Sequence, residues 1–189
     1  MLTKIITVLL AVIGILYPVI VFACIKYYSL NVLLGVLGSF FAIRLLLLLK
    51  SKSQFRKPVM AVCCIALILC GCSYILKASS LVLYYPVVVN LIFLGIFSLS
   101  LRGKSLVTRI AELQDPHLSD FARNYTRKVT WIWCLFFILN GLISYLTILS
   151  GDINIWTWYN GCISYILMGS LALGEYLLRI YLRRHYEKN

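Results

Sequence analysis

Long runs of apolar residues, separated by short polar segments, make up most of the chain. A helix of about 20 apolar residues crosses the roughly 30 Å hydrocarbon core of a bilayer. The runs that meet this length cover residues 5–23, 30–49, 58–76, 81–101, 129–149 and 156–180. We therefore predict an all-α fold, a polytopic membrane bundle of about six transmembrane helices, with residues 1–189 forming a single integral-membrane domain.

The first run carries a possible processing signal. Residues 21–24 have the outline of a lipoprotein cleavage box, but the bulky Phe22 fits it poorly and the run is longer than a usual signal core. We expect the run to be kept as the first span. Pro18 should kink its helix or end the regular part of it.

The longest polar stretch, residues 102–128, joins the fourth and fifth runs. Apolar residues recur at helical spacing in its first part, residues 104–114; they are Leu106, Val107, Ile110 and Leu113. This pattern predicts an interfacial amphipathic helix on the inner leaflet, with a solvated connector as the alternative. Pro116 should end that helix, and Ser119 is a plausible N-cap for another that runs into the fifth span.

Positive charge alternates from one loop to the next. Fifteen Lys and Arg residues lie in the amino-terminal segment, in residues 50–57, in the basic loop 102–128 and in the tail from Arg179. Two, Lys26 and Lys77, lie in the intervening loops. Short cytoplasmic loops carry the excess of Lys and Arg, so this alternation predicts that both termini and both basic loops are cytoplasmic.

Composition excludes a soluble domain, since 62% of the residues are hydrophobic and 13% are charged, with a mean hydropathy of +0.93. The net charge of +12 comes without a nucleic-acid-binding motif, so anionic phospholipids are the expected partners and nucleic acid is not. Candidate inner-leaflet or partner contacts in the basic loop are Lys104, Arg109, Arg123, Arg127 and Lys128.

Two ionisable residues fall inside predicted spans, Arg44 in the second and Glu175 in the sixth, at similar depth. A charge within a membrane helix is costly and is usually paired or faces a cavity. A structural ion pair between them is our first interpretation. The alternatives are that Arg44 snorkels to the headgroups while Glu175 pairs with Arg179 one turn on, or that both charges line a polar transport path.

Asparagines in the spans complete the candidate intramembrane polar network, which comprises Arg44, Glu175, Asn90, Asn140 and Asn160. Membrane asparagines more often bond between helices than bind a substrate. Small residues allow helices to approach closely, and Gly141, Gly161 and Gly169 are candidates for such contacts.

Candidate catalytic chemistry is sparse. Four cysteines, Cys63, Cys64, Cys70 and Cys72, lie inside an apolar run, where we expect buried thiols that behave as small hydrophobes. No phosphate-cradling glycine loop or nucleophile–base set occurs in the sequence. We therefore expect no enzymatic activity, no metal and no cofactor.

Several dispersed residues resemble the bacterial intracellular septation protein A family over roughly residues 75 to 180. They are Gly103-Lys104-Ser105-Leu106 with Arg109, then Arg127, Val129, Trp133, Leu135-Phe136-Phe137 and Gly141, preceded by Tyr85-Pro86-Val87 and followed by Trp156 and Trp158. The chain also resembles a related group of bacterial inner-membrane proteins of the same size.

The resemblance implies a multi-pass protein of the bacterial inner membrane, with a non-catalytic role in cell envelope biogenesis or septation. It would act through contacts with other inner-membrane proteins of envelope synthesis or division, and it could form homo-oligomers. Two alternatives remain open from the residues, a small transporter or lipid-handling protein and an accessory subunit of a membrane lipid-synthesis enzyme.

Overall fold

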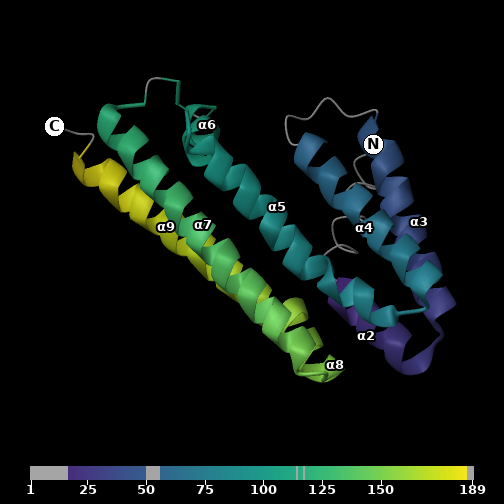
Figure 1. The fold of residues 1–189 in the computed structure, drawn as a ribbon. Coiled ribbons are helices and arrows are strands. Elements are labelled where there is room, and N and C mark those ends of the chain that lie inside the picture. Colours follow the sequence, from purple (N-terminus) through teal and green to yellow (C-terminus); the bar gives the residue numbers. More distant parts are fainter. Residues whose placement is uncertain (1–16, 50–55, 114, 117, 187–189) are drawn as a thin grey trace, which may run out of the picture.

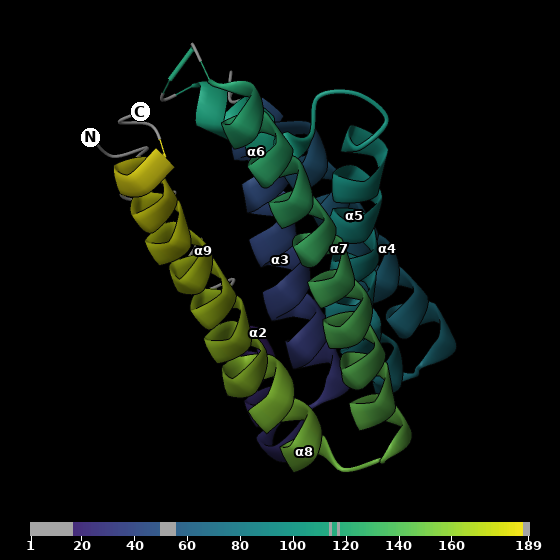
Figure 2. The ribbon, with the colours of Figure 1, turned by 90° about the vertical axis from the view of Figure 1, so that its left-hand side faces the viewer.

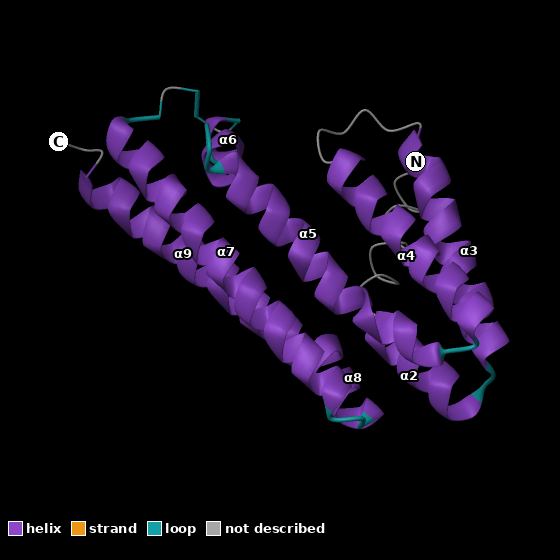
Figure 3. Ribbon diagram, in the orientation of Figure 1, coloured by secondary structure: helices purple, strands orange, loops and turns teal. Residues whose placement is uncertain are grey.

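The structure, a computed structural model, describes residues 17–49, 56–113, 115–116 and 118–186, in which every regular element is a helix (Figures 1 and 3). In chain order these are α2 (Tyr17–Tyr27), α3 (Leu30–Leu49), α4 (Arg56–Leu76), the 3₁₀ helix η1 (Ser79–Tyr84), α5 (Tyr85–Ser100), α6 (Leu106–Glu112), α7 (Asp120–Leu149), α8 (Ile153–Trp158), the π-helical η2 (Tyr159–Ile163) and α9 (Ser164–Tyr186). The predicted all-α fold is confirmed.

Five stretches within the described residues are long and apolar enough to cross a membrane. They are Asn31–Leu49, Val59–Leu76, Ser80–Ser100, Asp120–Leu149 and Ile153–Leu182, and they correspond to the second to sixth predicted spans. Most of the first predicted span, residues 5–23, lies outside the described residues, and α2 covers its end as a short apolar helix. The chain is therefore a membrane protein, while the first predicted span, and with it the total of six, and the orientation stay predictions.

The long helices form two antiparallel pairs, α3 with α4 and α5 with α7 (Figure 1). Helices α2, α8 and η1 gather at the end where these pairs meet. Helix α6, the start of α7 and the end of α9 lie at the opposite end, which the charge pattern predicts to be cytoplasmic. Figure 2 shows α7 and α9 close together near α8 and separated towards α6.

Side-chain caps fix the boundaries of the carboxy-terminal helices. Ser119 is the N-cap of α7, as predicted, and its hydroxyl accepts a hydrogen bond from the Ala122 amide at 3.2 Å. Gly151 makes the turn after α7 with a φ of +70°, a backbone conformation that suits glycine. Asp152 then caps α8, and hydrogen bonds from the backbone and side chain of Asn154 lower the pKa of its carboxyl.

The last two long helical segments begin before the apolar runs that they contain. Helix α7 begins at Asp120, so the second part of the basic loop is helical and runs into the fifth span, as predicted. The last helical segment begins at Ile153 and not at residue 156. In both cases the cap residue sets the start of the helix, whereas hydropathy reports only the apolar part.

The buried faces combine an aromatic and aliphatic core with small polar residues. Tyr17 of α2, Phe41 of α3, Tyr85 of α5 and Trp156 of α8 pack together. Among the cysteines of α4, Cys63 and Cys70 are buried as predicted, but Cys64 and Cys72 are exposed on the outer face of the helix. All four thiols are free.

Candidate functional site

A line of polar side chains runs along the inward face of α7. Asn140, Ser144 and Thr147 lie four and then three residues apart, a spacing that places them on one stripe of a helix. Their exposed fractions are 4%, 0% and 7%. Such groups need hydrogen-bond partners inside the protein, because neither lipid nor a dry interior supplies them.

Asparagine side chains connect α7 to α5. The Asn140 amide nitrogen donates to Asn90 Oδ1 at 3.0 Å, and the Asn90 amide nitrogen donates to the Pro86 carbonyl at 2.8 Å. The Tyr159 hydroxyl donates to Asn140 Oδ1 at 2.9 Å. One buried asparagine therefore joins α5, α7 and η2.

The third predicted asparagine extends this network along η2. Ser144 Oγ lies 2.8 Å from both Asn160 Oδ1 and the Asn140 carbonyl. The Asn160 amide nitrogen donates to the Trp156 carbonyl at 2.9 Å. The structure thus brings together all three asparagines named from the sequence. We call the set the asparagine network; its members are Asn90, Asn140, Ser144, Thr147, Tyr159 and Asn160.

The π-helical turn explains how two consecutive residues, Tyr159 and Asn160, both face α7. A π turn holds an extra residue within one turn of helix, and such turns are often found at functional sites. Hydropathy and residue spacing contain no signal for a π turn, so the role of Tyr159 could not be anticipated. Ser144 and Thr147 could have been found from their helical spacing to Asn140.

Close helix approach is confirmed at two of the three predicted glycines. A Cβ on Gly141 would lie 3.1 Å from Asn90 Cβ, which is tighter than nine in ten real Cβ contacts. A Cβ on Gly161 would lie 3.4 Å from Pro18 Cβ. A Cβ on Gly169 meets nothing within 4 Å in the described part of the chain, so the prediction of a close contact finds no support there.

Among the described side chains, Arg44 and Glu175 form no ion pair with each other. Glu175 pairs with Arg179 on its own helix, with 3.8 Å between Oε1 and Nε, which is the alternative considered from the sequence. Arg44, on α3, lies in the neighbourhood of Cys63 of α4 and Tyr85 of α5. Neither charge belongs to the asparagine network.

Basic residues at the α6 end of the bundle hold the segment that connects α5 to α6. Arg127 donates from Nη2 to the Leu101 carbonyl at 2.8 Å and from Nη1 to the Gly103 carbonyl at 3.4 Å, just beyond the end of α5. Arg109 donates from Nε to the Lys104 carbonyl at 3.0 Å. These arginines therefore stabilise the chain where α5 ends, in addition to presenting charge.

Acidic residues partner two further cations. Glu112 accepts from Lys104 at 2.8 Å and lies 3.9 Å from Arg123, which is also 4.0 Å from Asp120. Lys128 is exposed on α7. Four of the five cations predicted to contact lipid or a partner thus also have contacts within the chain.

Small polar residues form the seam between α6 and α7. The hydroxyls of Thr108 and Thr126 lie 2.8 Å apart, and Ser105 lies 2.7 Å from Thr108. Ile110 and Leu113 of the predicted apolar stripe are 37% and 68% exposed. The short helix is present, and its inward face is the small polar one.

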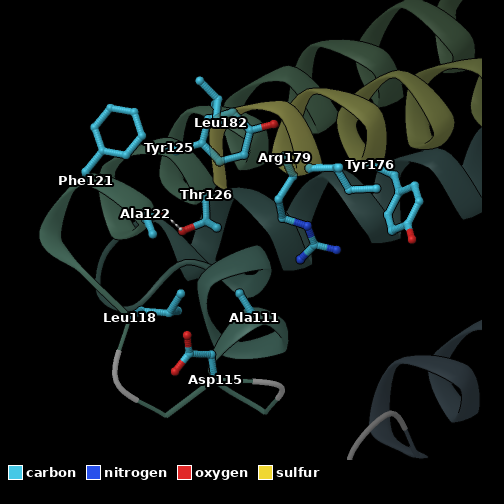
Figure 4. Close-up of a pocket in the computed structure, with 11 residues that line it drawn as sticks. Ala111, Asp115, Leu118, Phe121, Ala122, Tyr125, Thr126, Tyr176, Arg179 and Leu182 are labelled. Carbon is cyan, nitrogen blue, oxygen red and sulfur yellow. Dashed lines mark hydrogen bonds between the residues drawn. The ribbon is translucent and has the colours of Figure 1, made fainter. Parts of the chain in front are cut away.

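A cavity of about 270 Å³ lies beside this seam, between the start of α7, the end of α9 and the segment after α6. Figure 4 shows the side chains that line it. They are Ala111, Asp115, Leu118, Phe121, Ala122, Tyr125, Thr126, Tyr176, Arg179, Ile180 and Leu182. The lining combines aromatic and aliphatic surface with one guanidinium and one carboxylate.

Comparison of the chain with models of protein families, with curated proteins and with solved structures finds no match.

A double-mutant cycle should measure the link between Asn90 and Asn140. We expect a coupling free energy of about 0.6 kcal/mol, and up to about 1.7, when both are replaced by Ala, the range seen for hydrogen bonds between membrane helices. The measurement is equilibrium unfolding of the purified protein in mixed micelles.

The control cycle pairs Asn90→Ala with Thr130→Ala, since Thr130 is also buried on α7 but donates to the Thr126 carbonyl outside the network. Distant sites are expected to be additive. A coupling between Asn90 and Asn140 no larger than that with Thr130 would count against the network.

Proposed function

We propose that the protein is a non-catalytic component of the bacterial inner membrane that contributes to cell envelope biogenesis or septation by binding other membrane proteins. The observation that carries this proposal is the ordered surface formed by α6, which is held against α5 and α7 and presents cations and apolar side chains together. The resemblance of residues 75 to 180 to septation proteins motivates the choice of process.

The α6 surface has the composition of a protein-binding site. Ile110 of α6 and Leu113 at its C-cap are exposed, and Arg109 directly precedes Ile110 on the same short helix. Apolar residues beside arginine are typical of interface centres, where arginine is enriched. Buried hydroxyls and Arg127 fix α6, which lowers the entropy cost of binding a partner there.

The asparagine network supports an interaction role over transport. The Asn140 amide donates to Asn90, the Asn160 side chain accepts from Ser144, and the Asn90 and Asn160 amides donate to backbone carbonyls. A transport path along this face would need those groups to exchange their partners for a substrate. The geometry is that of a polar network which fixes how α5, α7 and η2 pack.

Site-specific photocrosslinking in living cells tests the proposal. A photoreactive residue at Ile110 should give a discrete adduct with a membrane protein of envelope synthesis or division. The same residue at Leu142, which is 52% exposed on α7 within the span, should give mainly lipid adducts. Ile110→Glu should reduce crosslinking from Leu113 by about ten-fold, the effect of losing 1.4 kcal/mol of binding.

The envelope role has its own readout. Deleting the gene in its native host should change cell length or sensitivity to envelope stress, and expression of the full chain should restore both. Lipid adducts alone at Ile110, or a deletion strain with normal length and normal stress sensitivity, would contradict the proposed function.

A further inference from the structure

The cavity between α7 and α9 contains charges of both signs. Arg179 reaches it from α9, and Asp115 lies on its α6 side (Figure 4). Glu175 lies 3.8 Å from Nε of Arg179. A guanidinium has five N–H donors and a carboxylate has about four acceptor positions, so each can bind a ligand in addition to a neighbour in the chain.

The cavity lies where lipid headgroups are expected. Helix α7 has 30 residues and is about 45 Å long at 1.5 Å per residue, which exceeds the roughly 30 Å hydrocarbon core. The cavity is lined by the first residues of α7, from Phe121 to Thr126, and by the last part of the α9 span, from Tyr176 to Leu182. Tyrosines such as Tyr125 and Tyr176 are enriched at headgroup depth.

The charge pattern selects the ligand. Arginine binds phosphate through paired N–H donors, and a carboxylate accepts hydrogen bonds from a primary ammonium. A purely anionic headgroup would be attracted to Arg179 but repelled by Asp115 and Glu175, whereas a zwitterion satisfies both signs. The phosphoethanolamine headgroup carries a phosphate and a primary ammonium a few bonds apart.

Size and lining agree with a headgroup. The volume of about 270 Å³ is just below the roughly 300–1,000 Å³ of sites that enclose whole small molecules. It admits a headgroup but not two acyl chains. Phe121 and Leu182 supply apolar surface at the wall, and Phe121 is 51% exposed, so the acyl chains can stay outside the cavity in contact with the surrounding bilayer.

We propose that this cavity binds the headgroup of a phosphoethanolamine phospholipid, with the phosphate at Arg179 and the ammonium at Asp115. The inference goes beyond the proposed function and does not depend on it, because the α6 partner surface and the cavity use different residues.

Native mass spectrometry of the purified full-length protein in detergent tests the assignment. The probes are phosphatidylethanolamine, phosphatidylglycerol and phosphatidylcholine with identical acyl chains. We expect the wild type to retain phosphatidylethanolamine about ten-fold better than phosphatidylglycerol, as one charge-assisted hydrogen bond would provide. Arg179→Gln should lower retention of phosphatidylethanolamine by about ten-fold or more.

Asp115→Asn gives the more diagnostic result, since it should reverse the preference towards phosphatidylglycerol. Arg102→Gln, which removes an exposed cation at the same end of the bundle that does not line the cavity, should leave the preference unchanged. Ala122→Leu should fill the cavity and abolish selective binding while both charges remain. Thermal unfolding of each variant in detergent separates loss of binding from loss of fold.

Equal retention of all three lipids by the wild type, or an Asp115→Asn variant with unchanged preference, would overturn the proposal. A preference for phosphatidylcholine would assign the site to the aromatic residues and so overturn the role of Asp115. Soluble glycerophosphoethanolamine should compete with the lipid. Binding of that compound without binding of the lipid would overturn a membrane lipid as the ligand.

Discussion

Replacing Trp156 with Ala is expected to lower the free energy of unfolding by about 3–5 kcal/mol, the usual cost of removing a buried Trp from a packed interior. The side chain is 1% exposed. Its indole nitrogen donates to the Leu83 carbonyl at 3.1 Å, and its ring lies edge-on to Tyr17 at 6.3 Å between centroids. The residue therefore connects α8 to η1 and α2 where the two helix pairs meet.

Trp158→Ala is the matched control, because Trp158 lies two positions further along the same helix and is 68% exposed. Trp158→Ala should lower the free energy of unfolding much less than Trp156→Ala does. Trp156→Phe should fall between the two, since it keeps most of the volume but leaves the Leu83 carbonyl without its indole donor. Unfolding in mixed micelles measures all three, and equal losses for Trp156→Ala and Trp158→Ala would show that burial of Trp156 is not what joins the helix pairs.

Replacing Gly141 with Leu should have the second largest effect, a loss of about 3 kcal/mol, at the upper end of the cost of overpacking a well-packed core. Even an Ala Cβ at this position would lie 3.1 Å from Asn90 Cβ, and a Leu side chain would force α5 and α7 apart. The shift would also stretch the 3.0 Å hydrogen bond between Asn140 and Asn90.

The comparison with Gly169 isolates the steric part of this effect. Gly169→Leu adds the same side chain to α9 at a position where, among the described residues, a Cβ would meet nothing within 4 Å beyond the adjoining backbone of its own helix. Replacing Gly in a helix generally favours the helix by up to about 1 kcal/mol, so Gly169→Leu should be neutral or stabilising. If both variants unfold at the same denaturant concentration, close approach at Gly141 is not important for stability.

Hydropathy and capping chemistry predicted much of the fold. The second predicted span, residues 30–49, coincides with α3, because its ends are marked by a change from polar to apolar residues. Ser119 was recognisable as an N-cap because a hydroxyl before a helical segment satisfies the first free amides. These signals are local in sequence.

The orientation of each helix about its own axis was not predictable in the same way. Helix α3 is apolar around its whole circumference, so nothing in the pattern indicated which neighbours Arg44 would face. Glu175 had a potential partner one turn away in Arg179, and the structure uses that local pair. Depth in the membrane, the only shared property of Arg44 and Glu175, does not determine contact.

The asparagines were identifiable as network members because amides in a membrane span must find partners. The hydrogen-bond partners of these asparagines were not predictable, because Ser144 and Asn160, for example, lie on opposite sides of a chain reversal. For α6 the apolar stripe predicted a lipid-facing side, but it did not indicate which residues pack against α7. Between helices in a membrane protein, small residues such as Thr108 and Ala111 give the closest packing, while larger apolar side chains can face outward.

The π-helical turn at Tyr159–Ile163 has a consequence for how relatives of this chain should be aligned. Each residue rotates an α-helix by about 100°, so one extra residue within the turn changes which positions face inward on its two sides. A homologue with an ordinary α-helical turn here would keep the inward faces of both α8 and α9 only if it were one residue shorter between Trp156 and Ser164. A single-residue gap at this point would therefore mark the gain or loss of the π turn in the history of the family.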